Sequence, residues 1–215
     1  MGGVGVEATK RFLTGLSMLV APLLLLVGFA IHPPEPQNGA ETLEVIVHDA
    51  ERWNAAHIMF SAGMVLSFPA VLGLTRLLGR RGAWFGLIGG VLAAIGVVFF
   101  SVFLGVELAM SAIASVPIEK HTGLEPGIQA LIDFAGPLPI VFLGLSLNLG
   151  LIVLAIGLFI TRAVPRWTSV VIAGASVVLV GGLFSNPVGA VGAAVLLVGL
   201  GTIGLQCLSR SNEAL

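Results

Sequence analysis

Long apolar blocks alternate with short polar segments along the whole chain. The blocks cover about residues 12–32, 54–78, 85–115, 138–161, 168–184 and 188–208. A helix needs about 20 consecutive apolar residues to cross the hydrocarbon core of a bilayer. The pattern therefore predicts an all-α membrane bundle of six transmembrane helices, folded as a single domain over residues 1–215.

Charge is scarce and unevenly distributed between the polar segments. Only 10% of the residues are charged, against roughly 25% in soluble domains. With the N-terminus in the cytoplasm, two basic residues, Arg52 and Lys120, lie outside, and eight lie inside: Lys10, Arg11, Arg76, Arg80, Arg81, Arg162, Arg166 and Arg210. Basic residues accumulate on the cytoplasmic side of membrane proteins. Both termini are therefore expected to be cytoplasmic.

Composition also bears on the partners of the chain. Its net charge is −1, and the basic residues form no patch of the kind that binds DNA or RNA, which excludes a nucleic-acid partner. The single cysteine, Cys207, excludes an intramolecular disulfide and a cysteine-based metal motif. The lipid bilayer is the expected partner.

The two longest polar segments, about 33–53 and 116–137, are predicted to be outer loops. In the first loop, Leu43, Ile46 and Val47 recur at helical intervals within "ETLEVIVHDAERW". This spacing predicts a short amphipathic helix lying along the outer surface. A second short helix is expected from about Glu125 to Phe134.

Ionisable residues at membrane depth mark functional sites, because burying a charge there is costly. Glu107 lies 23 residues after Trp84, or about 34 Å above the inner boundary at 1.5 Å per residue. His57 lies four residues after Trp53, or about 6 Å below the outer boundary. His32, at the end of the first block, is on the same level. The sequence therefore predicts that these three side chains form an outward-facing pocket.

Flanking residues extend this candidate pocket. The stretch "HDAERWNAAH" adds His48, Asp49 and Arg52 as supporting residues. Helical spacing predicts one stripe on each of two helices: His57, Ser61 and Met64 on one helix, and Phe100, Phe103, Glu107 and Ser111 on the other. If the two stripes face each other, they enclose a polar pocket above an aromatic floor.

Four interpretations of the pocket remain open. In the main one, the chain is a structural or partner-binding membrane protein, with a membrane-protein partner or self-association, and Glu107 only pairs with Arg52 or Lys120. In the second, Glu107 and His57 are a proton-linked pair in a small-solute transporter. In the third, His32, His57 and Glu107 bind a divalent metal, a donor set that suits zinc or non-haem iron; a haem between His32 and His57 is the weaker variant.

Hydrolytic catalysis is the fourth interpretation. It requires a nucleophile beside His57, for which Ser61 and Ser111 qualify by spacing alone. The sequence gives no fixed catalytic motif, so the balance is against an enzyme and no catalytic residue is assigned.

Several features together carry a family resemblance. They are "HPPEP" after the first helix, "HDAERWNAAH" at the second, "ELAMSA" late in the third and "VPRW" before the fifth. In this combination the chain resembles uncharacterised six-helix integral membrane proteins of high-GC Gram-positive bacteria. The resemblance implies a bacterial plasma-membrane location and brings no activity or ligand with it.

Overall fold

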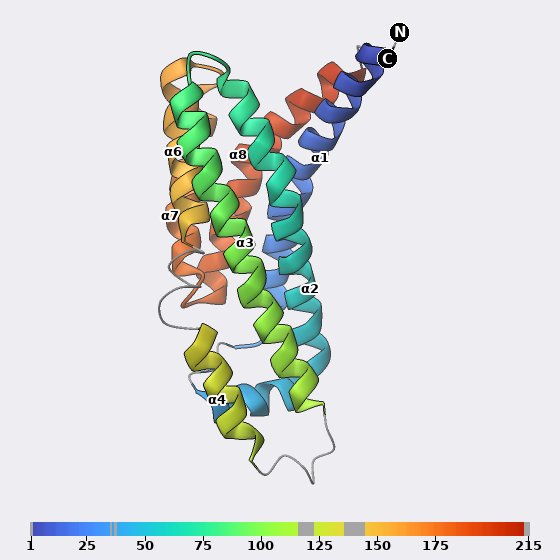
Figure 1. Ribbon diagram of the computed structural model, residues 1–215, viewed down its shortest axis with the longest axis vertical. Helices are drawn as coiled ribbons and strands as arrows, with labels where there is room; N and C mark the ends of the chain where they lie inside the picture. The colour runs from blue at the N-terminus through green and yellow to red at the C-terminus, as the bar shows by residue number, and fades with distance from the viewer. Residues whose placement is uncertain (1, 35, 37, 116–122, 136–144, 213–215) are drawn as a thin grey trace.

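The chain is all-α in the computed structural model, which describes residues 2–34, 36, 38–115, 123–135 and 145–212 (Figure 1). Seven helices lie in these ranges: α1 (Gly2–Ile31), α2 (Gly39–Leu78), α3 (Ala83–Ala114), α4 (Leu124–Ala135), α6 (Ser146–Thr161), α7 (Arg166–Gly181) and α8 (Asn186–Asn212).

Helix length and surface chemistry identify an integral membrane protein. Four described helices are long and apolar enough to cross a membrane, over Val6–Ile31, Gly39–Leu78, Ala83–Ala114 and Asn186–Ser209. Two shorter apolar helices, Ser146–Thr161 and Arg166–Gly181, accompany them. Large apolar side chains such as Val65, Leu87 and Val177 are more than half exposed on the outside of the bundle. This surface suits hydrocarbon rather than water.

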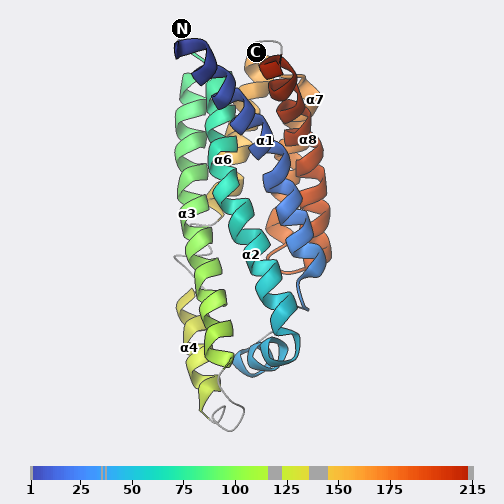
Figure 2. The same ribbon diagram turned by 90° about the vertical axis from the view of Figure 1, so that its right-hand side faces the viewer.

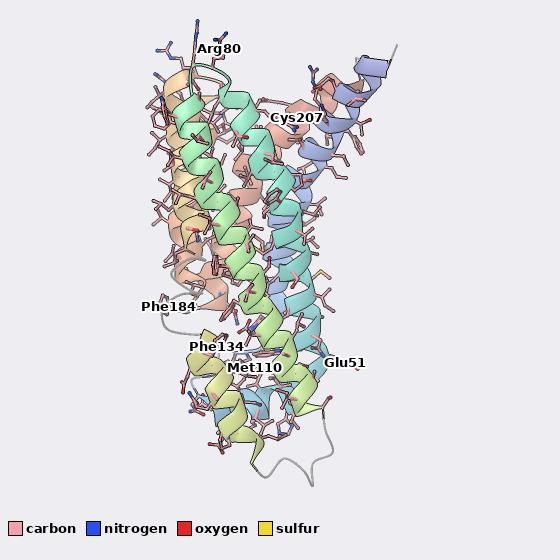
Figure 3. All side chains as sticks on the ribbon, in the orientation of Figure 1. Glu51, Arg80, Met110, Phe134, Phe184 and Cys207 are labelled. Atoms are coloured by element: carbon pink, nitrogen blue, oxygen red, sulfur yellow. The ribbon has the colours of Figure 1, made fainter. Side chains whose placement is uncertain are left out.

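Six of the helices form a closed ring. In ring order α1, α2, α3, α6, α7 and α8 each pack on the next, and α8 packs back on α1. Both ends of the chain lie at one end of the bundle, and α4 lies at the other (Figures 1 and 2). Arg80 marks the end with the termini, which we call the basic end; Glu51 and α4 mark the opposite, acidic end (Figure 3).

Glycines allow the backbones to touch at two helix pairs in the ring. A Cβ atom added to Gly204 of α8 would lie 2.6 Å from the Gly15 carbonyl oxygen of α1. A Cβ atom added to Gly150 of α6 would lie 2.6 Å from the Gly89 carbonyl oxygen of α3. Small residues at such crossings are typical of membrane helix packing. These contacts draw the helices of each pair close together.

The amphipathic helix predicted within residues 33–53 is present, but it is joined to α2 without the expected break. Asn38 caps a helix whose first turn begins at Gly39, with its side-chain oxygen accepting a hydrogen bond from the Glu41 N–H at 3.0 Å. The helix continues directly into α2, interrupted only by a kink at Asp49 (φ −123°, ψ 33°). The amphipathic segment before the kink crosses the acidic end, and Ile46, 1% exposed, packs with Ile128 of α4 in a second small core.

The other boundaries differ from the predicted ones to varying degrees. α3, α7 and α8 begin within two residues of the predicted positions 85, 168 and 188. α1 begins at Gly2, ten residues before the apolar block, because a helix can continue beyond the hydrocarbon core into its polar flank. α6 is described only from Ser146; residues 138–144 of the predicted fourth helix lie outside the described residues. α4 lies where the second short helix was expected.

Candidate functional site

His57 is the centre of a buried cluster at the acidic end of the bundle. Its side chain is fully buried on α2. The ring Nδ1 lies 2.6 Å from the Trp53 carbonyl oxygen, one helical turn earlier. The ring Nε2 lies 2.7 Å from Oε2 of Glu107 on α3. Both ring nitrogens therefore have a partner, and the second contact joins two neighbouring helices.

The partners of His57 place a hydrogen on Nδ1 and a shared proton at Nε2. A carbonyl oxygen only accepts hydrogen bonds, so Nδ1 carries a hydrogen and donates it to Trp53. Nε2 and the Glu107 oxygen then share one proton across 2.7 Å. Either a glutamic acid donates to a neutral imidazole, or an imidazolium donates to a carboxylate. In both forms the His57–Glu107 pair is electrically neutral and holds one shared proton.

Trp53 supports the same pair from the side. Its ring stacks on His57 with centroids 4.5 Å apart and an interplanar angle of 28°. Its indole N–H donates a hydrogen bond to the Glu107 backbone carbonyl at 3.2 Å. Glu107 is therefore held by α2 through both its main chain and its side chain.

His32 joins the cluster from the residue that follows α1. Its Nδ1 donates to the Pro33 carbonyl at 2.7 Å, and Asn186 at the start of α8 donates to the same carbonyl at 2.8 Å. Its ring centroid lies 5.0 Å from that of His57. Burial lowers the pKa of His32 and the nearby His57 lowers it further, against the opposing effect of the Pro33 carbonyl. A neutral His32 is the form that this environment favours.

The other three predicted pocket residues lie outside the cluster. His48 is exposed on the segment before the kink. The Arg52 guanidinium lies 3.4 Å from Asp49 and donates to the Ile31 carbonyl at 3.2 Å. The described contacts thus pair Arg52 with residues other than Glu107, and Lys120 lies outside the described residues. His48 and Asp49 lie at the kink, whereas Arg52 follows it on an exposed face of the helix that carries Trp53.

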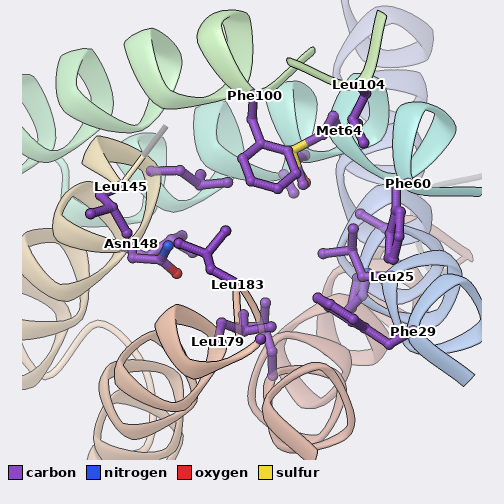
Figure 4. Close-up of a pocket in the computed structure, with 18 of the residues that line it drawn as sticks. Leu25, Phe29, Phe60, Met64, Phe100, Leu104, Leu145, Asn148, Leu179 and Leu183 are labelled. Atoms are coloured by element: carbon purple, nitrogen blue, oxygen red, sulfur yellow. The ribbon is translucent and has the colours of Figure 1, made fainter. Parts of the chain in front are cut away.

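A cavity of about 140 Å³ lies at the centre of the helix ring (Figure 4). His32 and Glu107 line its end near the acidic surface, and two further polar residues, Ser67 and Asn148, also line it. The remaining lining is apolar: Ala21, Pro22, Leu25, Phe29, Phe60, Met64, Ala70, Val71, Leu74, Phe100, Phe103, Leu104, Leu145, Leu147, Leu151, Leu179, Gly182, Leu183, Leu196 and Leu200. The cavity is therefore a long apolar space with a polar end.

The predicted aromatic floor is present, but the predicted serines are not part of it. Met64, Phe100 and Phe103 line the cavity, whereas Ser61 and Ser111 do not. His57 cannot act as a base for either serine, because Trp53 and Glu107 occupy its two ring nitrogens. The hydrolytic interpretation therefore finds no support in the geometry.

The metal and haem interpretations stay predictions. The Nδ1 of both His32 and His57 points at a carbonyl, which leaves Nε2 as the possible metal ligand of each ring, and in His57 this Nε2 lies 2.7 Å from Glu107. Among the residues that the structure describes, no group of three or more His, Cys, Asp or Glu side chains is placed to hold a metal ion. The centroids of the two histidine rings lie 5.0 Å apart, so a haem between them would have to separate the rings.

Sequence reasoning did not place two amide side chains in the site. Asn148 stands out in the sequence as a strongly polar residue at membrane depth, but spacing alone does not show that it lines the cavity. Asn186 sits in the turn "FSNPVG", where asparagine is common, and only the fold brings it to Pro33.

Comparison with known proteins gives no match: no family model, no curated protein and no solved structure matches this chain. The resemblance to six-helix bacterial membrane proteins therefore stays a prediction.

Proposed function

We propose that this chain is a six-span plasma-membrane protein, with both termini in the cytoplasm, that binds one long apolar chain of a lipid-like molecule in its central cavity. The observation that carries the proposal is the cavity itself, an apolar space inside a membrane bundle that ends at His32 and Glu107.

Charge and aromatic residues support the proposed orientation. Arg80 lies at the same end of the bundle as the start of α1 and the end of α8 (Figures 1 and 3). Trp84 and Trp167 are the second residues of α3 and α7 and are 74% and 49% exposed. Exposed tryptophans beside basic residues are typical of the boundary between hydrocarbon and cytoplasmic headgroups. The two 16-residue helices, α6 and α7, are about 24 Å long, which suits a span whose ends lie near the boundaries of the membrane.

The shape of the cavity favours a chain over a compact ring system. On α2 a single stripe of residues from Phe60 to Leu74 lines it, a length of about 21 Å at 1.5 Å per residue. This elongated lining suits an extended chain. An empty apolar cavity costs about 24 cal/mol per Å³, hence about 3 kcal/mol here. A bound hydrocarbon chain would recover much of this free energy.

The polarity of Asn148 also supports a bound ligand in the cavity. Its amide lines the cavity (Figure 4) and makes no hydrogen bond within the described part of the chain. An amide in an apolar space is costly unless it is hydrogen-bonded. A ligand with a polar group within reach of Asn148 would supply such a hydrogen bond.

Hydrocarbon binding by a filled cavity tests the proposal. Ala21 lines the cavity and is 2% exposed, whereas Ala30 on the same helix is exposed on the outside of the bundle. In detergent, hexadecane is expected to raise the melting temperature of the wild type and of Ala30→Leu, because a ligand stabilises the state that it binds. Ala21→Leu should need at least a tenfold higher hexadecane concentration for the same rise in melting temperature. An equal response of both variants would contradict the proposal.

Proton-linked transport is a second candidate, favoured by the proton that His57 and Glu107 share. It predicts pH-dependent solute uptake into vesicles that Glu107→Gln abolishes. The apolar lining toward the basic end, with Leu74 and Leu200, offers no second proton site among the lining residues. The structural or partner-binding interpretation accounts for the His57–Glu107 pair as a clamp between α2 and α3, and leaves the cavity unexplained.

A further inference from the structure

We propose that the molecule in the cavity is a long-chain alcohol, whose hydroxyl group donates a hydrogen bond to Oε1 of Glu107. This inference rests on the proposed function and names the chemistry of the head group. It follows from the hydrogen-bond donors and acceptors that face a ligand at the polar end of the cavity.

Glu107 offers the ligand an acceptor and no donor. Its Oε2 is engaged by His57 at 2.7 Å. Its Oε1 makes no hydrogen bond within the described residues, and the side chain, 20% exposed, lines the cavity. If the shared proton is on His57, Oε1 belongs to a carboxylate; if it is on Oε2, Oε1 is a carbonyl oxygen. Both forms of Oε1 only accept hydrogen bonds. The matching head group must therefore donate one.

Ser67 reinforces this preference further into the cavity. Its hydroxyl hydrogen is used on the Gly63 carbonyl at 2.8 Å. The lone pairs of the Ser67 oxygen remain, so this residue also presents an acceptor to the cavity. Asn148 can both donate and accept. A ligand that carries only acceptors, such as an ether or a ketone, finds one matching protein donor here, in Asn148.

The charge of the site favours a neutral head group over an ionised one. The His57–Glu107 pair is neutral as a whole, so it provides no net charge to balance an ion. Moving an ammonium or carboxylate head into the apolar surroundings of Phe100 and Leu104 would cost its hydration. A carboxylate would also face the oxygens of Glu107. A hydroxyl group donates one hydrogen bond at the lowest desolvation cost.

A series of ligands that share a sixteen-carbon alkyl chain tests the inference on the full-length protein in detergent. Hexadecan-1-ol should bind about tenfold more tightly than hexadecyl methyl ether, the factor that corresponds to about 1.4 kcal/mol for one hydrogen bond. The comparison is made by competition in native mass spectrometry at fixed detergent concentration. Hexadecylamine and hexadecanoate should bind more weakly than the alcohol.

Three variants separate the role of Glu107 from a general effect. Glu107→Leu should bind the alcohol and the ether equally and still bind hexadecane. Glu107→Gln should keep the preference, because the amide N–H can donate to His57 while the amide oxygen accepts from the ligand. Glu51→Leu, on the exposed surface of the acidic end, is the matched control and should keep the preference in full.

Each contrary result identifies what has failed. Equal binding of alcohol and ether by the wild type would overturn the inference and leave chain binding intact. A preference that persists in Glu107→Leu would overturn the role of Glu107. If hexadecylamine binds most tightly, the preferred head group is an ammonium rather than a hydroxyl group. If Glu107→Leu does not fold, the wild type and Glu107→Gln still decide the question. Failure of every ligand, hexadecane included, would refute the proposed function itself.

Discussion

Residues 48–52 and 53–57 follow each other on the same helix and have opposite surroundings. The first stretch holds His48, Asp49 and Arg52, which lie on the surface of the acidic end. The second holds Trp53 and His57, which are 2% and 0% exposed. The kink at Asp49 lies within the first stretch, so Arg52 follows it on the same helical run as Trp53 and His57. Polar composition alone therefore does not identify the site; what decides is the face of the helix on which a residue lies.

The same comparison shows how hydrogen bonds are distributed. On the surface, Arg52 and Asp49 pair at 3.4 Å with side chains about half exposed, an arrangement that contributes little to stability. In the interior, both ring nitrogens of His57 and the indole N–H of Trp53 have partners at 3.2 Å or less. Four substitutions and one pH titration test this contrast.

Removal of His57 should have the largest effect. His57→Ala deletes the stacked ring and both of its hydrogen bonds, and leaves Oε2 of Glu107 without its partner. Loss of one member of a buried pair costs about 3 kcal/mol, so we expect a fall of about 3 kcal/mol in the free energy of unfolding. The measurement is reversible unfolding in mixed micelles, with His48→Ala as the matched histidine control. A loss below about 1 kcal/mol would show that the pair is only weakly coupled to folding.

The titration of His32 should have an intermediate effect. Its pKa is lowered in the folded state, so the unfolded chain binds a proton at a higher pH than the folded chain does. Stability should be constant with respect to this group above about pH 7 and should fall as the pH drops below about 6.5, the ordinary pKa of histidine. Melting curves between pH 8 and 5 measure the change.

A variant without a titrating group isolates this contribution. His32→Asn keeps an N–H donor for the Pro33 carbonyl and cannot take up a proton in this range. Its stability should depend less steeply on pH than that of the wild type. Parallel curves for the two proteins would assign the acid sensitivity to other groups.

Substitutions of the exposed residues at the kink should have the smallest effect. Asp49→Asn removes a half-exposed ion pair with Arg52, and His48→Ala changes an exposed side chain. Each should alter the free energy of unfolding by less than about 0.5 kcal/mol and leave hexadecane binding unchanged. A larger loss in Asp49→Asn would indicate that the kink itself depends on this carboxylate.

Much of the fold follows from hydrophobic pattern, because a helix in hydrocarbon must satisfy its own backbone. The beginnings of α3, α7 and α8 were predictable to within two residues for this reason. The continuous helix from Gly39 into α2 was not, because polar and apolar residues mix in that stretch and the Asn38 cap is one of several polar residues there. Six spans and cytoplasmic termini remain predictions.

The candidate site was predictable in part. Depth alone placed His32, His57 and Glu107 on one level, and the structure brings them into contact. Depth does not tell which way a side chain points, so His48 and Arg52 were included although they face outward. The cavity could not be predicted from the sequence, because its volume depends on the distances between six helices at the centre of the ring.

The closed ring also bears on how the protein is made. α1 packs against both α2 and α8. Its interface with α8 can therefore form only after α8 has been synthesised. Chains are synthesised from the N-terminus at about 5–20 residues per second, which leaves the bundle open along one side until α8 has entered the membrane. During that interval the future cavity is in direct contact with bilayer lipid. A hydrocarbon chain can therefore be enclosed as the ring closes, and the newly assembled protein would already carry its first ligand.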